Sequence, residues 1–232
     1  MSYDEVTAPA DLKARLKASY DAIADTYNAW TTDHHAVRLR YLEKFTAQLP
    51  QHPAPTRLLE LGCGAGVPAT QLLASIPGAE VIGNDLSGRQ VSLARANAET
   101  WTLPADSSVR FVEGDMADES VLSFGAGELD GVVALYSLIH LPRAEQAAML
   151  GRIGRWLRPG GLLLANFSAG EMEGVVMEKW LAEEGWMFWS GWGEGTVGRV
   201  EEGGLEVLVQ AVEKEEVDVG FLWVLARKRA EA

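Results

Sequence analysis

The sequence predicts an α/β protein built on a doubly wound, mostly parallel sheet. From residue 56 to residue 168, apolar segments typical of strands alternate with segments of helical periodicity. Such alternation arises from right-handed βαβ units, which build a parallel sheet with helices on both faces. A glycine-rich turn, "LGCGAG", stands between the first of these strands and the helix that follows it. The length of 232 residues fits one such domain with additional segments.

Two helices are predicted before this alternation begins. Apolar residues recur at spacings of three and four from Leu12 to Trp30, which marks one face of an amphipathic helix. A second helical pattern runs from Leu39 to Leu49 and ends at "LPQHPAPT", where three prolines indicate a linker. We therefore expect residues 1–54 to form an N-terminal helical cap and residues 55–232 to form the main domain.

After the linker, the predicted elements follow in order. The strands are "RLLELG", "AEVIGND", "VRFVEGD", "LDGVVALYS" and "GLLLANFS", with helices through Leu73, through Ala98 and from Arg143 to Leu157. The segment from Glu171 to Arg199 is rich in tryptophan and glycine, and helical character is expected only as far as Leu181. The final segments, "LEVLVQAV" and "VGFLWVLAR", predict two strands that pair antiparallel at one edge of the sheet.

Composition limits the functions that are open to this chain. The net charge of -13, from 33 acidic and 20 basic residues, repels nucleic acid and anionic membranes. The single cysteine, Cys63, excludes an intrachain disulfide and indicates a reducing compartment. With no apolar core typical of a signal peptide and no run long enough to span a bilayer, a soluble cytoplasmic protein is expected, as a monomer or a homodimer. Four scattered histidines and one cysteine give no zinc-ligand spacing, so no metal is expected.

The glycine turn predicts a cofactor site. A helix that follows a strand presents unpaired N–H groups and a positive dipole end, and glycines let a ligand approach the backbone there. A dinucleotide fingerprint, Gly-x-Gly-x-x-Gly, would require its third glycine at the position of Val67. The observed spacing is instead Gly-x-Gly-x-Gly, which disfavours a nicotinamide oxidoreductase.

This spacing, together with Glu60 before it, Asp85 at the end of the second strand and "EGDM" after the third, resembles the class I S-adenosylmethionine-dependent methyltransferases. The resemblance runs from about Tyr20 to Arg227. It is nearest to the small-molecule branch, with methyltransferase domains of type 11 or 25, through "ALYSLIHLPR", "WLRPGG" and "FWSGW". It implies a seven-stranded sheet, S-adenosyl-L-methionine as cofactor and S-adenosyl-L-homocysteine as product.

The resemblance also implies how the cofactor is bound. Asp85 would accept hydrogen bonds from the ribose hydroxyls, the alternative being a helix cap. Leu86 would lie against the adenine, and Glu60 near the methionine amino group unless it only orders the turn. Tyr20 would cover the methionine end, although core packing explains its spacing from Tyr27 equally well. The predicted cofactor contacts are Tyr20, Glu60, Gly62, Gly64, Gly66, Asp85, Leu86, Asp115, Met116 and Leu135. Cys63 is interpreted as a small filler of the turn.

A small, mostly apolar acceptor, aromatic or heterocyclic, is expected near the end of the fourth strand. His140 follows that strand and is the candidate general base, with anchoring of its loop as the alternative. Residues 171–199 are predicted to form an aromatic substrate lid, in which two of Trp186, Phe188, Trp189 and Trp192 pack on the sheet. The predicted acceptor contacts are Tyr136, His140, Trp189 and Trp192. His34 and His35 are expected at the surface.

Two other functions remain open on the sequence. One is a methyltransferase acting on protein or RNA, which the acidic balance disfavours. The lack of an Asn-Pro-Pro-Tyr-like signature after the fourth strand, where the chain has "ALYS", also disfavours it. The other is a regulator that binds the cofactor without catalysis, because its cofactor motifs would be identical.

Overall fold

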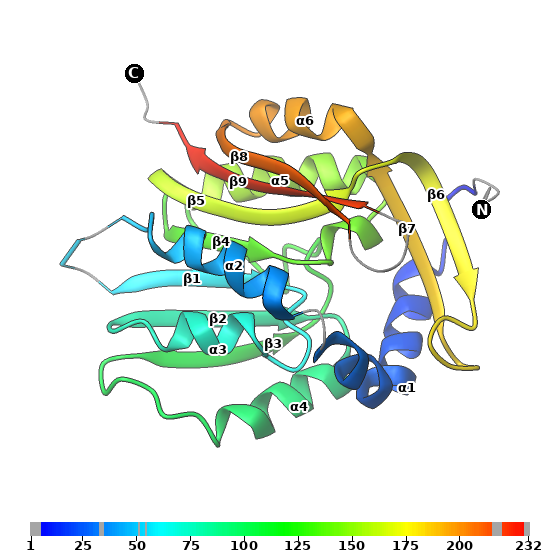
Figure 1. The fold of residues 1–232 in the computed structure, drawn as a ribbon, viewed down its shortest axis with the longest axis horizontal. Helices are drawn as coiled ribbons and strands as arrows, with labels where there is room; N and C mark the ends of the chain where they lie inside the picture. Colours follow the sequence, from blue (N-terminus) through cyan, green and yellow to red (C-terminus); the bar gives the residue numbers. More distant parts are fainter. Residues whose placement is uncertain (1–5, 33–34, 51, 54, 215–219, 230–232) are drawn as a thin grey trace.

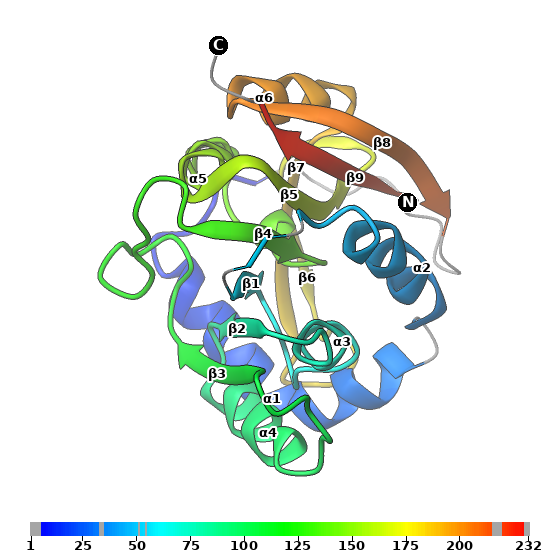
Figure 2. The same ribbon diagram turned by 90° about the vertical axis from the view of Figure 1, so that its left-hand side faces the viewer.

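A seven-stranded sheet forms the centre of the computed structural model, which describes residues 6–32, 35–50, 52–53, 55–214 and 220–229. The strand order is β3-β2-β1-β4-β5-β9-β8 (Figures 1 and 2). Strands β1 to β5 are parallel to one another, whereas β9 pairs antiparallel with both β5 and β8. The bounds are β1 (Thr56–Leu61), β2 (Ala79–Asp85), β3 (Ser108–Glu113), β4 (Leu129–Ala134), β5 (Leu157–Ser168), β8 (Leu205–Lys214) and β9 (Gly220–Lys228). The predicted fold class, with its antiparallel edge pair, is confirmed.

Helices cover both faces of this sheet because successive strand residues point to opposite sides. Leu58 and Val133 pack in the cluster that contains α2 (His35–Thr46) and α3 (Ala69–Ala74). Their neighbours Leu59 and Val132 pack in the cluster that contains α5 (Arg143–Trp156) and α6 (Thr196–Glu202). Figure 2 shows these two helix pairs on opposite sides of the strands. Among the described residues, no helix combines the length and apolar composition needed to cross a bilayer.

The two N-terminal helices take different positions. Helix α1 (Leu12–Thr31) lies across the carboxyl ends of the parallel strands, close to α4 (Gly88–Ala98) (Figure 1). Its buried residues Leu12, Leu16 and Ile23 form the periodic apolar face that the sequence predicts. Helix α2 instead packs on the face of the sheet. Within the predicted cap, only α1 therefore covers the strand ends.

The segment after β5 is a β-hairpin, and the helical character expected between Glu171 and Leu181 is wrong. Strands β6 (Glu171–Glu178) and β7 (Trp186–Trp192) pair antiparallel as a separate two-stranded sheet. β-branched and aromatic residues favour strands, and β6 contains Val175 and Val176, whereas β7 contains three tryptophans and a phenylalanine. Trp186 and Phe188 are buried, as expected for two of the four aromatic residues, but they pack against α1 rather than against the main sheet.

Candidate functional site

Strand β1 ends in the glycine turn, in which three glycines have left-handed backbone conformations. The φ angles are +73° at Gly62, +53° at Gly64 and +79° at Gly66, a region that glycine adopts without a steric penalty. Gly62 is required for a second reason, because a Cβ there would lie 2.4 Å from the Cβ of Ser137. At Gly64 the nearest atom to such a Cβ would be Gln90 Oε1, at 3.9 Å. The turn is thus packed closely at Gly62 and open at Gly64.

Asp85 ends β2 beside this turn and organises the backbone around it. Its Oδ2 accepts a hydrogen bond from the N–H of Gly64 at 2.8 Å, and its Oδ1 accepts one from the N–H of Ser87 at 2.9 Å. The N–H of Gly62 donates to the carbonyl of Asn84 at 2.8 Å. Burial raises the pKa of Asp85 to about 6, although the two N–H donors oppose this shift. One carboxylate therefore holds the loops after β1 and β2 together.

A cavity lies between these loops and α1. Its lining residues are Lys13, Leu16, Tyr20, Tyr27, Gly62, Gly64, Asp85, Leu86, Gln90, Asp115, Met116, Leu135, Tyr136, Ser137, His140 and Leu141. All but two of the predicted cofactor contacts are in this lining. Gly66 packs against Trp101, and Glu60 lines an adjoining cavity. The fold therefore brings together residues that are more than a hundred positions apart in the sequence.

The adjoining cavity contains two buried ionisable side chains, Glu60 and Arg38. Glu60 accepts a hydrogen bond from the hydroxyl of Thr70, and burial raises its pKa to about 8. The guanidinium of Arg38 lies over the ring of Tyr136 at 4.6 Å, and the side chain is only 8% exposed. Within the described part of the chain, Arg38 Nε has no hydrogen-bond partner. A buried cation with an unsatisfied donor suits an anionic ligand group.

Arg38 is absent from the predicted site, although its position in the sequence carries a signal. It lies in α2 on the same buried face as Tyr41, Leu42 and Phe45. Arginine is almost never fully buried unless it is paired. An arginine within an apolar helical stripe therefore indicates a site, and the spacing of three and four residues would have identified it.

His140 is held by two different elements. It lies in a short 3₁₀ helix (Leu138–His140) after β4. Its Nδ1 is 2.8 Å from the carbonyl oxygen of Phe188 in β7, and its Nε2 is 2.9 Å from the hydroxyl of Tyr20 in α1. Burial lowers the pKa of His140 to about 4, so that the ring is neutral near pH 7. Both alternatives for His140 are therefore compatible with the structure. The contact of Nδ1 with Phe188 suits a loop anchor, and the neutral ring with Nε2 at the hydroxyl of Tyr20 suits a base.

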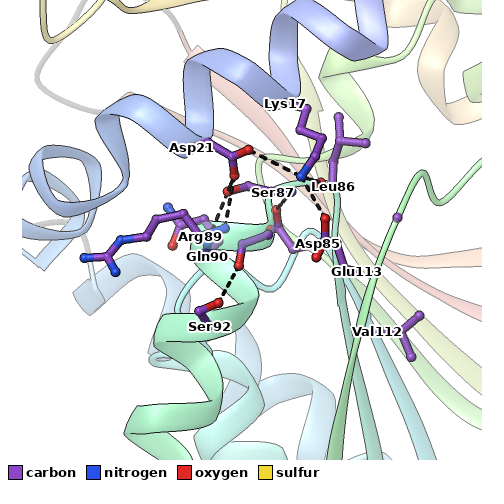
Figure 3. Close-up of polar contacts among 12 residues, drawn as sticks. Lys17, Asp21, Asp85, Leu86, Ser87, Arg89, Gln90, Ser92, Val112 and Glu113 are labelled. Atoms are coloured by element: carbon purple, nitrogen blue, oxygen red, sulfur yellow. Dashed lines mark hydrogen bonds and ion pairs between the residues drawn. The ribbon is translucent and has the colours of Figure 1, made fainter.

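Helix α1 is tied to the loop after β2 by charged side chains (Figure 3). Asp21 accepts a hydrogen bond from the hydroxyl of Ser87 at 2.6 Å, beside the N-terminus of α4. Lys17 pairs with Glu113 at 2.8 Å and donates to the carbonyl of Leu86 at 3.4 Å. These contacts were not predicted, because nothing in the helical pattern of α1 specifies what its polar face meets.

The predicted cofactor contact Asp115 also meets α1. Its carboxylate lies 3.4 Å from the ammonium of Lys13, which pairs with Glu145 at 2.7 Å. The Oδ1 of Asp115 further accepts a hydrogen bond from the N–H of Ala117 at 2.9 Å. Lys13 is thus a cation at the cavity wall that sequence reasoning missed.

The two tryptophans predicted as acceptor contacts differ in position. Trp189 is half-buried, with its ring centroid 6.3 Å from that of His140. Neither tryptophan is among the residues that line the cavity, and the ring of Trp192 packs against the guanidinium groups of Arg143, at 4.9 Å, and Arg199, at 4.5 Å. Trp189 therefore lies near His140, whereas Trp192, at the end of β7, packs against the two arginines.

Of the remaining predicted positions, Cys63 lines the same cavity as Glu60. Cys63 is buried in the glycine turn, where burial raises the pKa of its thiol, as expected for a filler. His35 is the first residue of α2 and is half-buried. His34 lies outside the described residues.

The chain is similar to proteins of known class. The sequence model of a family described as "Methyltransferase domain" matches residues 58–161, from β1 into β5. A demethylmenaquinone methyltransferase of Thermus thermophilus is 38% identical over 111 residues, which are 48% of this chain and 46% of that protein. The chain spans about half the length of the curated relatives it matches.

Two solved structures share the fold over almost the whole chain. A 1,6-didemethyltoxoflavin-N1-methyltransferase from Burkholderia thailandensis, with S-adenosylhomocysteine bound, has a TM-score of 0.72 at 19% identity and is matched over 99% of this chain and 94% of that one. The [4+2]-cyclase SpnF has the same TM-score and identity, over 99% and 100%. The fold thus occurs in proteins named for different reactions.

Proposed function

We propose that this chain is a class I S-adenosylmethionine-dependent methyltransferase, which transfers the methyl group of this cofactor to a small, mostly apolar acceptor. The observation that carries the proposal is the composition of one cavity. The glycine turn and Asp85 line one side of it, and Tyr20 and His140 line the other. A cofactor site and a candidate proton acceptor therefore share the same enclosed space.

The residues of both cavities fit the parts of the cofactor. Asp85 would accept hydrogen bonds from the ribose hydroxyls, and Leu86, Asp115 and Met116 would surround the adenine. The methionine end carries a carboxylate and an ammonium group. Arg38, with its unpartnered Nε, suits that carboxylate, and Glu60 in the same cavity suits the ammonium group. Of the other predicted contacts, Gly62, Gly64 and Leu135 line both cavities.

When bound, the cofactor supplies a methyl group that its sulfonium already activates. The chain's own residues then have to align the acceptor for in-line attack and to exclude water. Helix α1 and the hairpin cover the carboxyl ends of the strands (Figure 1), with Leu16 and Tyr20 in the cavity wall. We assign residues 171–199 as the substrate lid of a domain that spans residues 55–232.

We propose an aromatic or heterocyclic acceptor that lies against Trp189, with Tyr136 nearby and oxygen, nitrogen or sulfur as the methylated atom. Aromatic side chains favour such rings by stacking. The names of two similar proteins, a demethylmenaquinone and a didemethyltoxoflavin methyltransferase, also refer to small cyclic molecules. Trp192 is left out of this proposal because its ring already lies between two guanidinium groups.

Calorimetric titration with S-adenosylhomocysteine and with NAD tests the cofactor. We expect binding of the first only, and a loss of about 10- to 100-fold in affinity for Arg38→Met, the range for removing a charged hydrogen bond. Arg40→Met is the matched control, because Arg40 is half-exposed on the same helix and pairs with Glu213 outside both cavities. Binding of NAD, or of neither compound, would overturn the proposal.

A screen of phenols, thiols and amines, with mass detection of the methylated product, tests the reaction. Transfer to one of these classes supports the proposal. Cofactor binding without transfer to any acceptor would favour the non-catalytic regulator. Transfer only to protein or RNA in a cell extract would favour a macromolecular methyltransferase.

A further inference from the structure

The two ring nitrogens of His140 have partners of different chemistry. Nδ1 faces the carbonyl oxygen of Phe188, which can only accept a hydrogen bond. Nδ1 must therefore carry the proton of the neutral ring, and Nε2 is left with its lone pair. The hydroxyl oxygen of Tyr20 lies 2.9 Å from Nε2, so Tyr20 donates this hydrogen bond and His140 accepts it.

This arrangement means that the basic nitrogen of His140 is already engaged. Tyr20 and His140 both line the cavity, and because the hydroxyl of Tyr20 occupies the lone pair of Nε2, the proton of an acceptor would reach this nitrogen through that hydroxyl. Burial raises the pKa of Tyr20 well above its ordinary value, so the hydroxyl keeps its proton at neutral pH. The positive charge of Lys13 in α1 lowers the pKa of His140, as burial does, and so favours the neutral imidazole.

We propose that Tyr20 is a further catalytic residue, which takes up the acceptor's proton at its oxygen while its own proton moves to Nε2 of His140. This inference rests on the proposed methyl transfer. The X–H bond of the acceptor breaks, and its electron pair forms the bond to the methyl group. The bond between sulfur and that methyl group breaks, and its pair stays on sulfur. The positive charge thus passes from the sulfonium to the imidazolium, whose Nδ1–H remains bonded to Phe188.

The lid strand takes part in this relay through its backbone. Phe188 lies in β7, and its carbonyl selects the tautomer in which Nε2 is free to accept a proton. If the hairpin moved away from α1, the carbonyl of Phe188 would also move away from His140. The relay is therefore complete only when α1, β7 and the loop after β4 are together, which couples lid closure to proton removal.

Nitrogen-15 NMR of the histidine side chains tests the geometry without any acceptor. We expect His140, assigned by its absence in His140→Asn, to be the Nδ1–H tautomer at pH 7. In Tyr20→Phe the Nε2 resonance should shift, because its donor is lost, while the proton stays on Nδ1. The control is Tyr41→Phe, which removes from α2 a hydroxyl that donates to Glu213 of β8. It should change neither the Nε2 resonance nor the tautomer of His140. A proton on Nε2, or an unchanged Nε2 resonance in Tyr20→Phe, would overturn the relay.

Methyl transfer to two phenols tests the chemistry. Phenol itself must lose its proton, whereas 4-nitrophenol is largely ionised at pH 8. Tyr20→Phe should lower kcat for phenol by about 100-fold, the lower range for general acid–base catalysis, and change kcat for 4-nitrophenol by less than about 3-fold. Equal losses for both phenols, or a loss in His140→Ala that Tyr20→Phe does not share, would overturn the relay and leave methyl transfer intact. If the parent methylates neither phenol, the NMR result alone decides the relay.

Discussion

The cofactor side and the lid side of the cavity are built in different ways. On the cofactor side, backbone N–H groups of the glycine turn and of the loop after β2 donate to the carbonyl of Asn84 and to the carboxylate of Asp85 over shorter sequence distances. On the lid side, His140 meets Phe188, and Tyr20 meets His140, across 48 and 120 positions of the chain. The first region is specified by local backbone rules, and the second depends on packing between distant elements.

The difference explains how far each region can be substituted. A backbone turn with φ values above zero admits few residues, so its sequence carries a recognisable pattern. A lid held by aromatic packing admits many sequences of similar volume. Substitutions on the cofactor side should therefore have large effects on stability or on cofactor affinity. Substitutions on the lid side should have smaller effects, which appear in the opening of the hairpin and in acceptor binding.

The largest effect is expected for Gly62→Ala. The new Cβ meets the Cβ of Ser137, and the residue keeps a left-handed conformation, so we expect a loss of about 3 kcal/mol or more in the free energy of unfolding. Gly160→Ala is the matched control, with φ at +82° and no atom within 4 Å of the added Cβ. It should lose only about 1 kcal/mol. The free energy of unfolding is measured by urea denaturation. If both variants lost the same amount, the structure around Gly62 and Ser137 would have moved to make room for the new Cβ.

Asp85→Ala should weaken binding of S-adenosylhomocysteine by about 10- to 100-fold in calorimetry. The substitution removes the proposed ribose acceptor and leaves the N–H groups of Gly64 and Ser87 without their partner. Asp118→Ala is the control, because Asp118 is exposed after β3 and bonds only locally, to Ser120. If Asp85→Ala binds like the parent, Asp85 is not the ribose ligand.

Acid should weaken cofactor binding by about tenfold between pH 7 and pH 5. The pKa of Asp85 in the free protein is about 6, so lowering the pH protonates it, which favours the free folded state but removes the charged acceptor. Glu60, with a pKa of about 8, stays largely protonated over this range and adds little to the slope. Calorimetry of Asp85→Asn should show a flat profile, whereas a slope that persists there would assign the titration to another group.

The sequence predicts the parallel sheet and its antiparallel edge pair, because strands and turns follow local rules, and most of the predicted cofactor contacts line one cavity. The family match and the fold confirm the resemblance to class I methyltransferases. The hairpin was not predicted, since its strands pair with each other and pack on α1, which lies far away in the sequence. Lys13 and the contact of Tyr20 with His140 were missed for the same reason, because each depends on which helix meets which loop. Arg38 differs, because its place in an apolar helical stripe is a signal in the sequence itself.

The smallest effect on cofactor affinity is expected at the tip of the lid. Trp180 packs edge-on against Tyr20 and Trp30, with ring centroids 6.4 and 5.7 Å apart, and so fastens the hairpin to α1. Trp180→Ala should leave the dissociation constant for S-adenosylhomocysteine within about 3-fold of the parent. It should also speed cleavage by a glutamate-specific protease about tenfold, because the exposed Glu183 and Glu184 lie in the turn and local opening becomes easier.

Val212→Ala is the control for this variant, since Val212 is an exposed apolar residue on β8, with 57% of its surface accessible, and belongs to the main sheet. It should change neither binding nor cleavage. If Trp180→Ala weakened cofactor binding as much as Asp85→Ala, the lid would be part of the cofactor site rather than a separate cover. Unchanged cleavage would mean that the hairpin stays on α1 without this ring, held by the buried Trp186 and Phe188.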